Sequence, residues 1–182
     1  MALPANVTTG LWTLDPSHSE IGFTVRHAGI SKVRGQFTDA AATLDLAENV
    51  ADSKVNASIK TASFDSGDAN RDGHVRGEDF FDVETFPEIS FVSNTIVPKG
   101  DAYELQGDLT IKGITRPVAL ETEFNGVAVD PFGNTRAGLS AETTISRKDF
   151  GLTWNAVLEA GGVLVSDKVA INLELAFIAP AA

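Results

Sequence analysis

The chain has 182 residues, a length typical of one domain, and its 14 Lys and Arg against 25 Asp and Glu give a net charge of −11. This acidity argues against binding to nucleic acid and against docking on anionic lipid, because both depend on basic surfaces. The absence of cysteine excludes disulfides and thiolate metal sites, and no apolar run reaches the roughly 18 residues that a membrane-spanning helix needs.

Residues 1–10 have neither the basic start nor the apolar core of a secretory signal peptide. We therefore expect an N-terminal extension over 1–10 within a single domain that covers 1–182. The expected location is cytoplasmic, or periplasmic or secreted if a signal was trimmed. Trp12 follows directly and is expected to be either a core residue or a plug at one end of the fold.

Apolar and polar residues alternate along most of the chain, which is typical of strands with one buried face. The alternation is clearest over 20–27, 54–60, 103–112 and 169–177, and further strands are predicted near 34–46, 88–97, 117–129 and 136–147. Turn signals at 98–101, 130–134 and 160–162 separate successive strands and indicate an antiparallel meander. Because closure protects the strand edges, we predict an all-β fold, an extended eight-stranded antiparallel β-barrel, with an open two-sheet sandwich as the alternative.

Residues 65–87 interrupt this pattern, since they are too rich in Gly and Asp for a strand. Asp68 is suited to cap a short helix that runs to about Arg76 and ends at Gly77. The segment also carries Phe80, Phe81 and Phe86. Two interpretations stay open: the rings only pin a loop across one end of the barrel, or the segment is a helical lid that also lines a ligand cavity.

Sequence motifs for catalysis are lacking. His18, His27 and His74 do not have the spacing of a metal site, and no nucleophile elbow or phosphate-binding glycine loop is present. Asp149 is expected to pair with Arg147 or Lys148, or to cap the turn that follows it. We therefore predict no catalytic residue, no metal and no cofactor.

Several stretches resemble the YceI-like family: WTLDPSHSE at 12–20, FTVRH at 23–27, NRDGHVRGEDFFD at 70–82, GDLTIKGIT at 107–115 and SRKDFG at 146–151. VRGQF at 33–37, FPEISF at 86–91 and GGVLVSDKV at 161–169 are also similar to it. The resemblance implies a lipocalin-like barrel whose hydrophobic pore holds a polyisoprenoid, such as an isoprenoid quinone or a polyprenyl phosphate. It also implies a homodimer, and many family members are exported to the periplasm.

The pore of such a barrel would be lined by inward-facing apolar side chains. The predicted lining residues are Phe23, Val25, Phe37, Ile59, Phe91, Leu109 and Ile111, with Phe80 and Phe81 closing the pore from the lid. The predicted contacts to the head group of the lipid are Arg26, His27, Asn70, Arg71 and His74.

Three functions are compatible with these observations. The first is non-enzymatic binding, storage or transport of an isoprenoid lipid; the second is an interaction or stress-response barrel without a ligand. The third is an enzyme on a small apolar substrate, with His27 or Asp149 as acid or base. Residues 65–88 carry eight carboxylates against two arginines, a net charge of −6. We therefore predict a preference for a neutral head group over a pyrophosphate, unless Arg71 and Arg76 turn inward.

Overall fold

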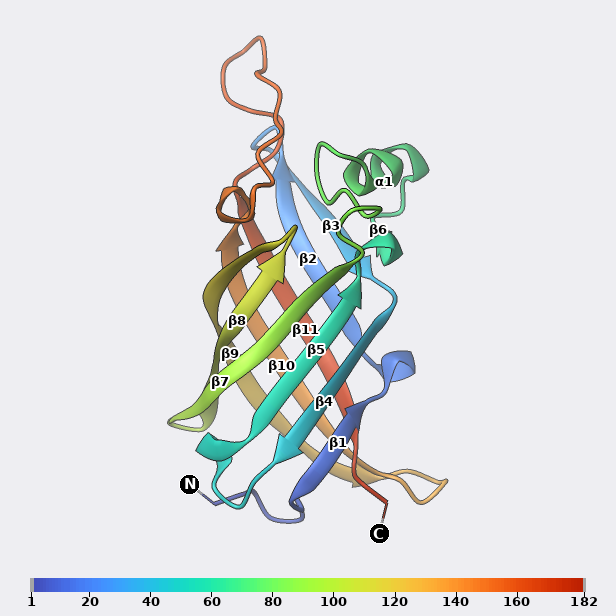
Figure 1. Cartoon of the computed structure of the whole chain (residues 1–182), viewed down its shortest axis with the longest axis vertical. Coiled ribbons are helices and arrows are strands. Elements are labelled where there is room, and N and C mark those ends of the chain that lie inside the picture. The colour runs from blue at the N-terminus through green and yellow to red at the C-terminus, as the bar shows by residue number, and fades with distance from the viewer. Residues whose placement is uncertain (1, 182) are drawn as a thin grey trace.

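The computed structural model describes residues 2–181 and contains one antiparallel β-barrel with a single α-helix in this part of the chain (Figure 1). Eight strands form the ring in the order β1, β4, β5, β7, β8, β9, β10 and β11, and the pairing of β1 with β11 closes it. The predicted fold class is thereby confirmed. The strands are β1 Gly10–Leu14, β2 Glu20–His27, β3 Ser31–Phe37, β4 Ala40–Leu46, β5 Lys54–Lys60, β6 Phe64–Asp65, β7 Glu88–Lys99, β8 Ala102–Ile111, β9 Ile114–Val129, β10 Thr135–Ser146 and β11 Lys168–Ile178.

Four short 3-10 helices lie between strands: η1 Pro16–His18 between β1 and β2, η2 Val50–Asp52 between β4 and β5, η3 Thr61–Ser63 between β5 and β6, and η4 Arg147–Phe150 after β10. Strand β11 pairs with β1 near its C-terminal end and with β2 along its N-terminal half, so β1 and β2 act as one wall strand broken at η1. The sequence analysis missed β1 and assigned Gly10 to the extension. Five residues that stop before Pro16 are too short for a clear alternation.

A buried carboxylate holds the bend at η1. Asp15 accepts hydrogen bonds from the backbone N–H and hydroxyl of Ser17, from Nδ1 of His18 and from Arg136 on β10. Arg136 also donates to Asp130 in the turn between β9 and β10, at 2.7 Å. The hydrogen bonds from Ser17 and Arg136 hold the pKa of Asp15 well below its usual range. This network links the end of β1 to the start of β10 and to the turn between β9 and β10.

The two ends of the barrel differ. The chain termini lie at one end, here called the terminal end, and residues 65–87, here called the lid segment, cover the other, the lid end (Figure 1). The lid segment contains α1 (Ala69–Arg76), whose first turn is capped by the Asp68 carboxylate accepting from the N–H of Arg71 at 2.9 Å. Gly77 follows as the C-cap. The predicted helix and both of its ends are confirmed.

Inward-facing side chains form the core, which follows the inner surface of the barrel. One buried cluster, which includes Phe80, Phe91 and Leu109, lies toward the lid end, and a second, which includes Trp12 and Phe177, lies toward the terminal end. Along β8 the alternation places Tyr103, Leu105, Leu109 and Ile111 inward, as predicted. The period-two pattern therefore builds an apolar inner wall along the barrel.

Candidate functional site

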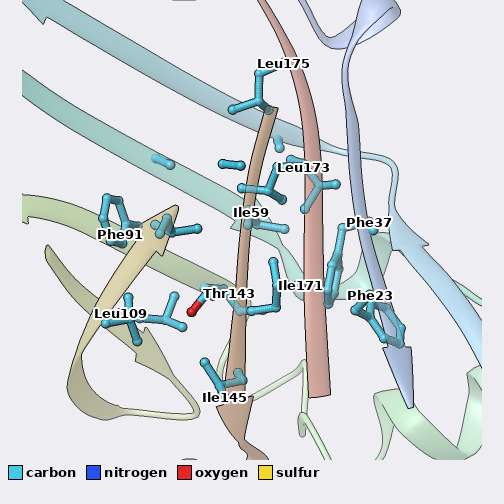
Figure 2. A pocket seen from close by; sticks show the side chains of 18 of the residues that line it. Phe23, Phe37, Ile59, Phe91, Leu109, Thr143, Ile145, Ile171, Leu173 and Leu175 are labelled. Carbon is cyan, nitrogen blue, oxygen red and sulfur yellow. The ribbon is translucent and has the colours of Figure 1, made fainter. Parts of the chain in front are cut away.

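A cavity of about 690 Å³ lies inside the barrel. Its lining extends from Leu3, Pro4 and Val7 at the terminal end to the lid segment at the other, and no Asp or Glu among the described residues takes part in it. Figure 2 shows inward side chains from several strands around this space, and Thr143 is the only labelled residue there with a polar side-chain atom. The barrel is therefore a container with apolar walls rather than a fully packed core.

All nine apolar residues predicted from the sequence line this cavity. They are Phe23, Val25, Phe37, Ile59, Phe80, Phe81, Phe91, Leu109 and Ile111. They come from five strands, β2, β3, β5, β7 and β8, and from the lid segment, and the barrel closure brings them together. Their contact with a ligand stays a prediction.

Two glycines provide space along the wall for aromatic rings. A Cβ atom on Gly35 would lie 2.3 Å from Cζ of Phe23, and a Cβ atom on Gly107 would lie 2.5 Å from Cζ of Phe91. Gly35 is the β3 partner of Phe23 on β2, so the ring of Phe23 lies over the neighbouring strand. Because both rings lie against the wall, they take up less of the cavity.

Four phenylalanines join the lid segment to the barrel. The ring of Phe81 packs edge-on against Phe37 with centroids 5.7 Å apart and lies tilted against Phe64 at 5.9 Å, and Phe23 stacks on Phe64 at 5.3 Å. Phe80 lines the cavity next to His74 and Trp154, whereas Phe86 lies against Gly113 and does not line it. Of the two interpretations of the lid, Phe86 fits pinning and Phe80 and Phe81 fit a cavity wall.

The five predicted head-group residues all lie at the lid end of the cavity and are largely exposed there: Arg26, His27, Asn70, Arg71 and His74. Arg71 donates from Nε to the hydroxyl of Ser66 at 2.7 Å and from Nη2 to its carbonyl at 3.0 Å. The ring of His74 packs edge-on against Trp154 at 4.6 Å, and its Nε2 bonds Asp79 at 2.9 Å. They form a polar rim around the mouth, and a role in head-group binding stays a prediction.

The charged side chains of the lid segment are arranged unevenly about the cavity. None of its carboxylates lines the cavity, and the buried Asp72 accepts from the backbone N–H of Ser66 at 2.9 Å. Arg71 does line the cavity, whereas Arg76 donates to the carbonyl of Phe64 instead. The preference for a neutral head group stays a prediction: Arg71, a cation, lines the cavity, and the lid carboxylates do not.

Arg147 lies at the lid end of the wall with 4% of its surface exposed. Its guanidinium donates to the carbonyls of Leu152 and Trp154 at 2.7 and 2.9 Å, and to those of Val165 and Ser166 at 3.2 and 2.9 Å. Burial lowers the pKa of this side chain. Arg147 therefore ties both sides of the connection between η4 and β11 to the barrel rim.

The sequence analysis did not recognise this role. Of the three roles expected for Asp149, the pairing with Arg147 is wrong, because the donors of Arg147 all go to backbone carbonyls and Asp149 is exposed. Phe64 and Trp154 were also missed as lining residues. The resemblance of residues 146–151 to the family was the available signal for Arg147, but it did not indicate burial.

No group of three or more His, Asp or Glu side chains within residues 2–181 is placed to hold a metal ion. His18 lies at η1 beside Asp15, whereas His27 and His74 lie at the mouth. Over the same residues, no helix has the length and apolar character needed to cross a membrane.

Comparison with known proteins agrees with this architecture. Residues 12–177 match the YceI-like domain. A UPF0312 protein of Vibrio parahaemolyticus is 38% identical over 156 residues, which cover 84% of this chain and 82% of that protein.

Two solved structures share the barrel. The crystal structure of Burkholderia cenocepacia BcnA superposes with a TM-score of 0.78 and 25% identity, over 90% of this chain and 98% of that one. A polyisoprenoid binding domain from Saccharophagus degradans, implicated in plant cell wall breakdown, superposes with a TM-score of 0.69 over 93% of this chain and 98% of that one. The sequence identity between the two chains is 14%, so this similarity concerns the fold alone.

Proposed function

The chain belongs to the YceI-like family, and we propose that its barrel binds, stores or carries a polyisoprenoid lipid without chemical conversion. The observation that carries this proposal is the cavity of about 690 Å³, whose walls are apolar between a polar rim at the lid end and an apolar floor at the terminal end. Cavities of this size and character are those that bury most of the surface of a small ligand. The shared fold of a polyisoprenoid binding domain supports the same ligand class.

Burial of the tail supplies the driving force. A tail that buries about 400 Å² of apolar surface gains about 10 kcal/mol at 25 cal/mol per Å². The loss of rigid-body freedom and of tail flexibility offsets a large part of this gain. The net affinity therefore depends on how much of the cavity the tail fills, and each open stretch of wall contributes to it.

The polarity of the two ends sets the orientation of the lipid. Arg26, Asn70 and Arg71 place hydrogen-bond donors at the lid end, whereas Leu3, Pro4 and Val7 line the terminal end. The head group therefore lies at the lid end and the tail points toward Trp12. Donors of this kind suit a head group rich in acceptors, which covers both the carbonyls of a quinone and the oxygens of a phosphate.

The two tryptophans allow a direct test, because both line the cavity and a quinone ring quenches indole fluorescence. Trp154 lies at the lid end against His74, and Trp12 lies in the cluster toward the terminal end. In the Trp12→Phe variant, which keeps Trp154, titration with a short-tailed ubiquinone is expected to quench strongly, whereas the Trp154→Phe variant should respond weakly. Saturable quenching that is stronger for Trp12 would reverse the orientation, and no saturable quenching in either variant would overturn the binding proposal.

An enzymatic role has less support from the site. Asp149, one of the two proposed acid–base groups, does not line the cavity. His27 lies at the exposed rim rather than inside. The geometry therefore favours binding of an intact ligand.

A further inference from the structure

Two loops at the lid end expose aliphatic side chains beside the mouth of the cavity. The turn between β2 and β3 carries Ile30 with 84% of its surface exposed. The hairpin over 156–165, here called the projecting hairpin, carries Val157 and Val163 with 85% and 46% exposed. In Figure 1 the projecting hairpin extends beyond the rest of the barrel at this end, and the β2–β3 turn lies beside its base.

These tips are held in place by hydrogen bonds. The projecting hairpin closes through the N–H of Leu158 to the carbonyl of Gly162 at 3.1 Å and the N–H of Leu164 to the carbonyl of Ala156 at 2.9 Å. The N–H of Ala28 in the β2–β3 turn donates to the carbonyl of Leu164 at 2.7 Å. These hydrogen bonds therefore join the two loops to each other.

The β2–β3 turn has an unusual composition for its geometry. Ala28 and Gly29 both have positive φ, 52° and 73°, the arrangement in which Asn and Gly are strongly preferred. The turn here reads Ala-Gly-Ile, so no polar side chain stands at its tip. A tip that faces only water gains nothing from Ile30 in place of a polar residue.

The strands that flank the β2–β3 turn carry a group of positive charges in an otherwise acidic chain. Arg26 and Lys32 are direct cross-strand partners, and Arg34 follows on the same face; all three are exposed. Within the described residues none of the three has an ion-pair partner, in contrast to Lys60 with Glu88. Two positive charges opposite one another, such as Arg26 and Lys32, destabilise the pairing of β2 with β3. The projecting hairpin adds little negative charge nearby, since Glu159 is its only carboxylate.

From these observations we infer that the β2–β3 turn and the projecting hairpin form a docking surface for the face of an anionic lipid bilayer. Ile30, Val157 and Val163 enter the interface, while Lys32 and Arg34 contact the lipid phosphates. Seven of the 25 acidic residues belong to the lid segment, whose helix α1 lies apart from the projecting hairpin in Figure 1, so the net charge of −11 is not concentrated at this hairpin. In a protein docked through this surface, the mouth of the cavity faces the membrane.

Vesicle flotation of the full chain tests the surface without any isoprenoid present. Vesicles of phosphatidylcholine with a minor fraction of phosphatidylglycerol are expected to carry the protein upward, and pure phosphatidylcholine much less. The Lys32→Gln/Arg34→Gln variant should lower partitioning roughly fivefold for each charge removed, only on the anionic vesicles. The Ile30→Ser/Val157→Ser variant should lower it on both. Unchanged melting temperatures confirm that these exposed substitutions leave the fold intact.

Matched controls lie away from this edge. Phe132, 88% exposed in the turn between β9 and β10 at the terminal end, controls for the loss of an exposed apolar residue, and exposed Lys54 on β5 controls for the loss of a charge. Absence of flotation with the wild type, or equal losses for Phe132→Ser and Ile30→Ser, would overturn the inference. Concentration-dependent dimerisation that the Ile30→Ser/Val157→Ser variant abolishes, with no change in flotation, would also overturn the inference. Flotation without lipid uptake would instead contradict the proposed function and leave the docking surface standing.

Discussion

The glycine beneath Phe23 provides a sharp test of whether the open volume of the barrel governs binding. A Cβ atom on Gly35 would lie 2.3, 2.9 and 3.1 Å from three ring atoms of Phe23, closer than the roughly 3.5 Å of ordinary carbon contacts. Phe37 and Phe64 flank this ring, with centroids at 5.9 and 5.3 Å. In Gly35→Ala the ring therefore has to move by more than about 1 Å, and the space available to it is the cavity.

The magnitude follows from the contact area that the displaced ring denies to the tail. If the ring removes about 60–80 Å² of apolar contact, the loss is about 1.5–2 kcal/mol at 25 cal/mol per Å². This corresponds to an affinity for a short-tailed ubiquinone that is roughly 10- to 30-fold weaker, measured by fluorescence titration. The melting temperature should change little, since the clashing atoms belong to the far end of a side chain that can turn.

Two comparisons make the test specific. Gly138→Ala on β10 adds the same methyl group where Asn125 lies at an ordinary 3.6 Å, and it should bind as the wild type does. Adding Phe23→Leu to Gly35→Ala removes the ring atoms that clash, so part of the affinity should return. An unchanged affinity in Gly35→Ala, or a loss that the second substitution does not relieve, would refute the reasoning.

Three further predictions concern the rim, the closure and the mouth. Arg147→Met leaves loop carbonyls without donors and should cost about 3 kcal/mol, which lowers the melting temperature by roughly 6–12 °C in thermal unfolding monitored by circular dichroism; a smaller shift than that of Lys148→Met would contradict it. The hydrogen bonds from Arg136 and from the N–H of Asn134 lower the pKa of Asp130 to about 2, and Asp15 is also lowered, so their contribution to stability is present above about pH 4 and is lost as the pH falls through these values. Urea midpoints measured between about pH 5 and 2 should therefore fall less steeply in Asp130→Asn than in the wild type, and parallel curves would contradict the assignment. Arg71→Ala should weaken competition by a polyprenyl phosphate more than binding of the quinone, and equal effects on both would remove Arg71 from the head-group site.

The elements that the sequence predicts well are those whose signal is local. Alternation over 20–27 and 103–112 and the capping pair Asp68 and Gly77 depend on neighbouring residues, and the structure confirms them. Strand β1 was not predicted, because its five residues are too few to show the alternation of apolar and polar side chains. The stretch near 34–46, predicted as one strand region, contains the end of β3 and all of β4, which are separated only by Thr38 and Asp39.

The candidate site divides in the same way. Its apolar wall follows from the alternation, because every second residue of a barrel strand faces inward. Arg147 could not be assigned from the sequence, since its partners lie up to 19 residues away and are backbone carbonyls, which carry no side-chain signal. Arg71 was predicted at the mouth, although α1 itself is short and polar, with no apolar stripe to indicate which of its side chains face the cavity.

The most direct test of the central claim is the content of the barrel itself. The protein, purified without detergent, is extracted with organic solvent, and the extract is analysed by lipid mass spectrometry before and after incubation with an isoprenoid quinone. The account predicts an isoprenoid lipid at up to one molecule per chain, present on purification or acquired on incubation, and reduced in Gly35→Ala. A wild-type barrel that holds no isoprenoid and takes up none would contradict it.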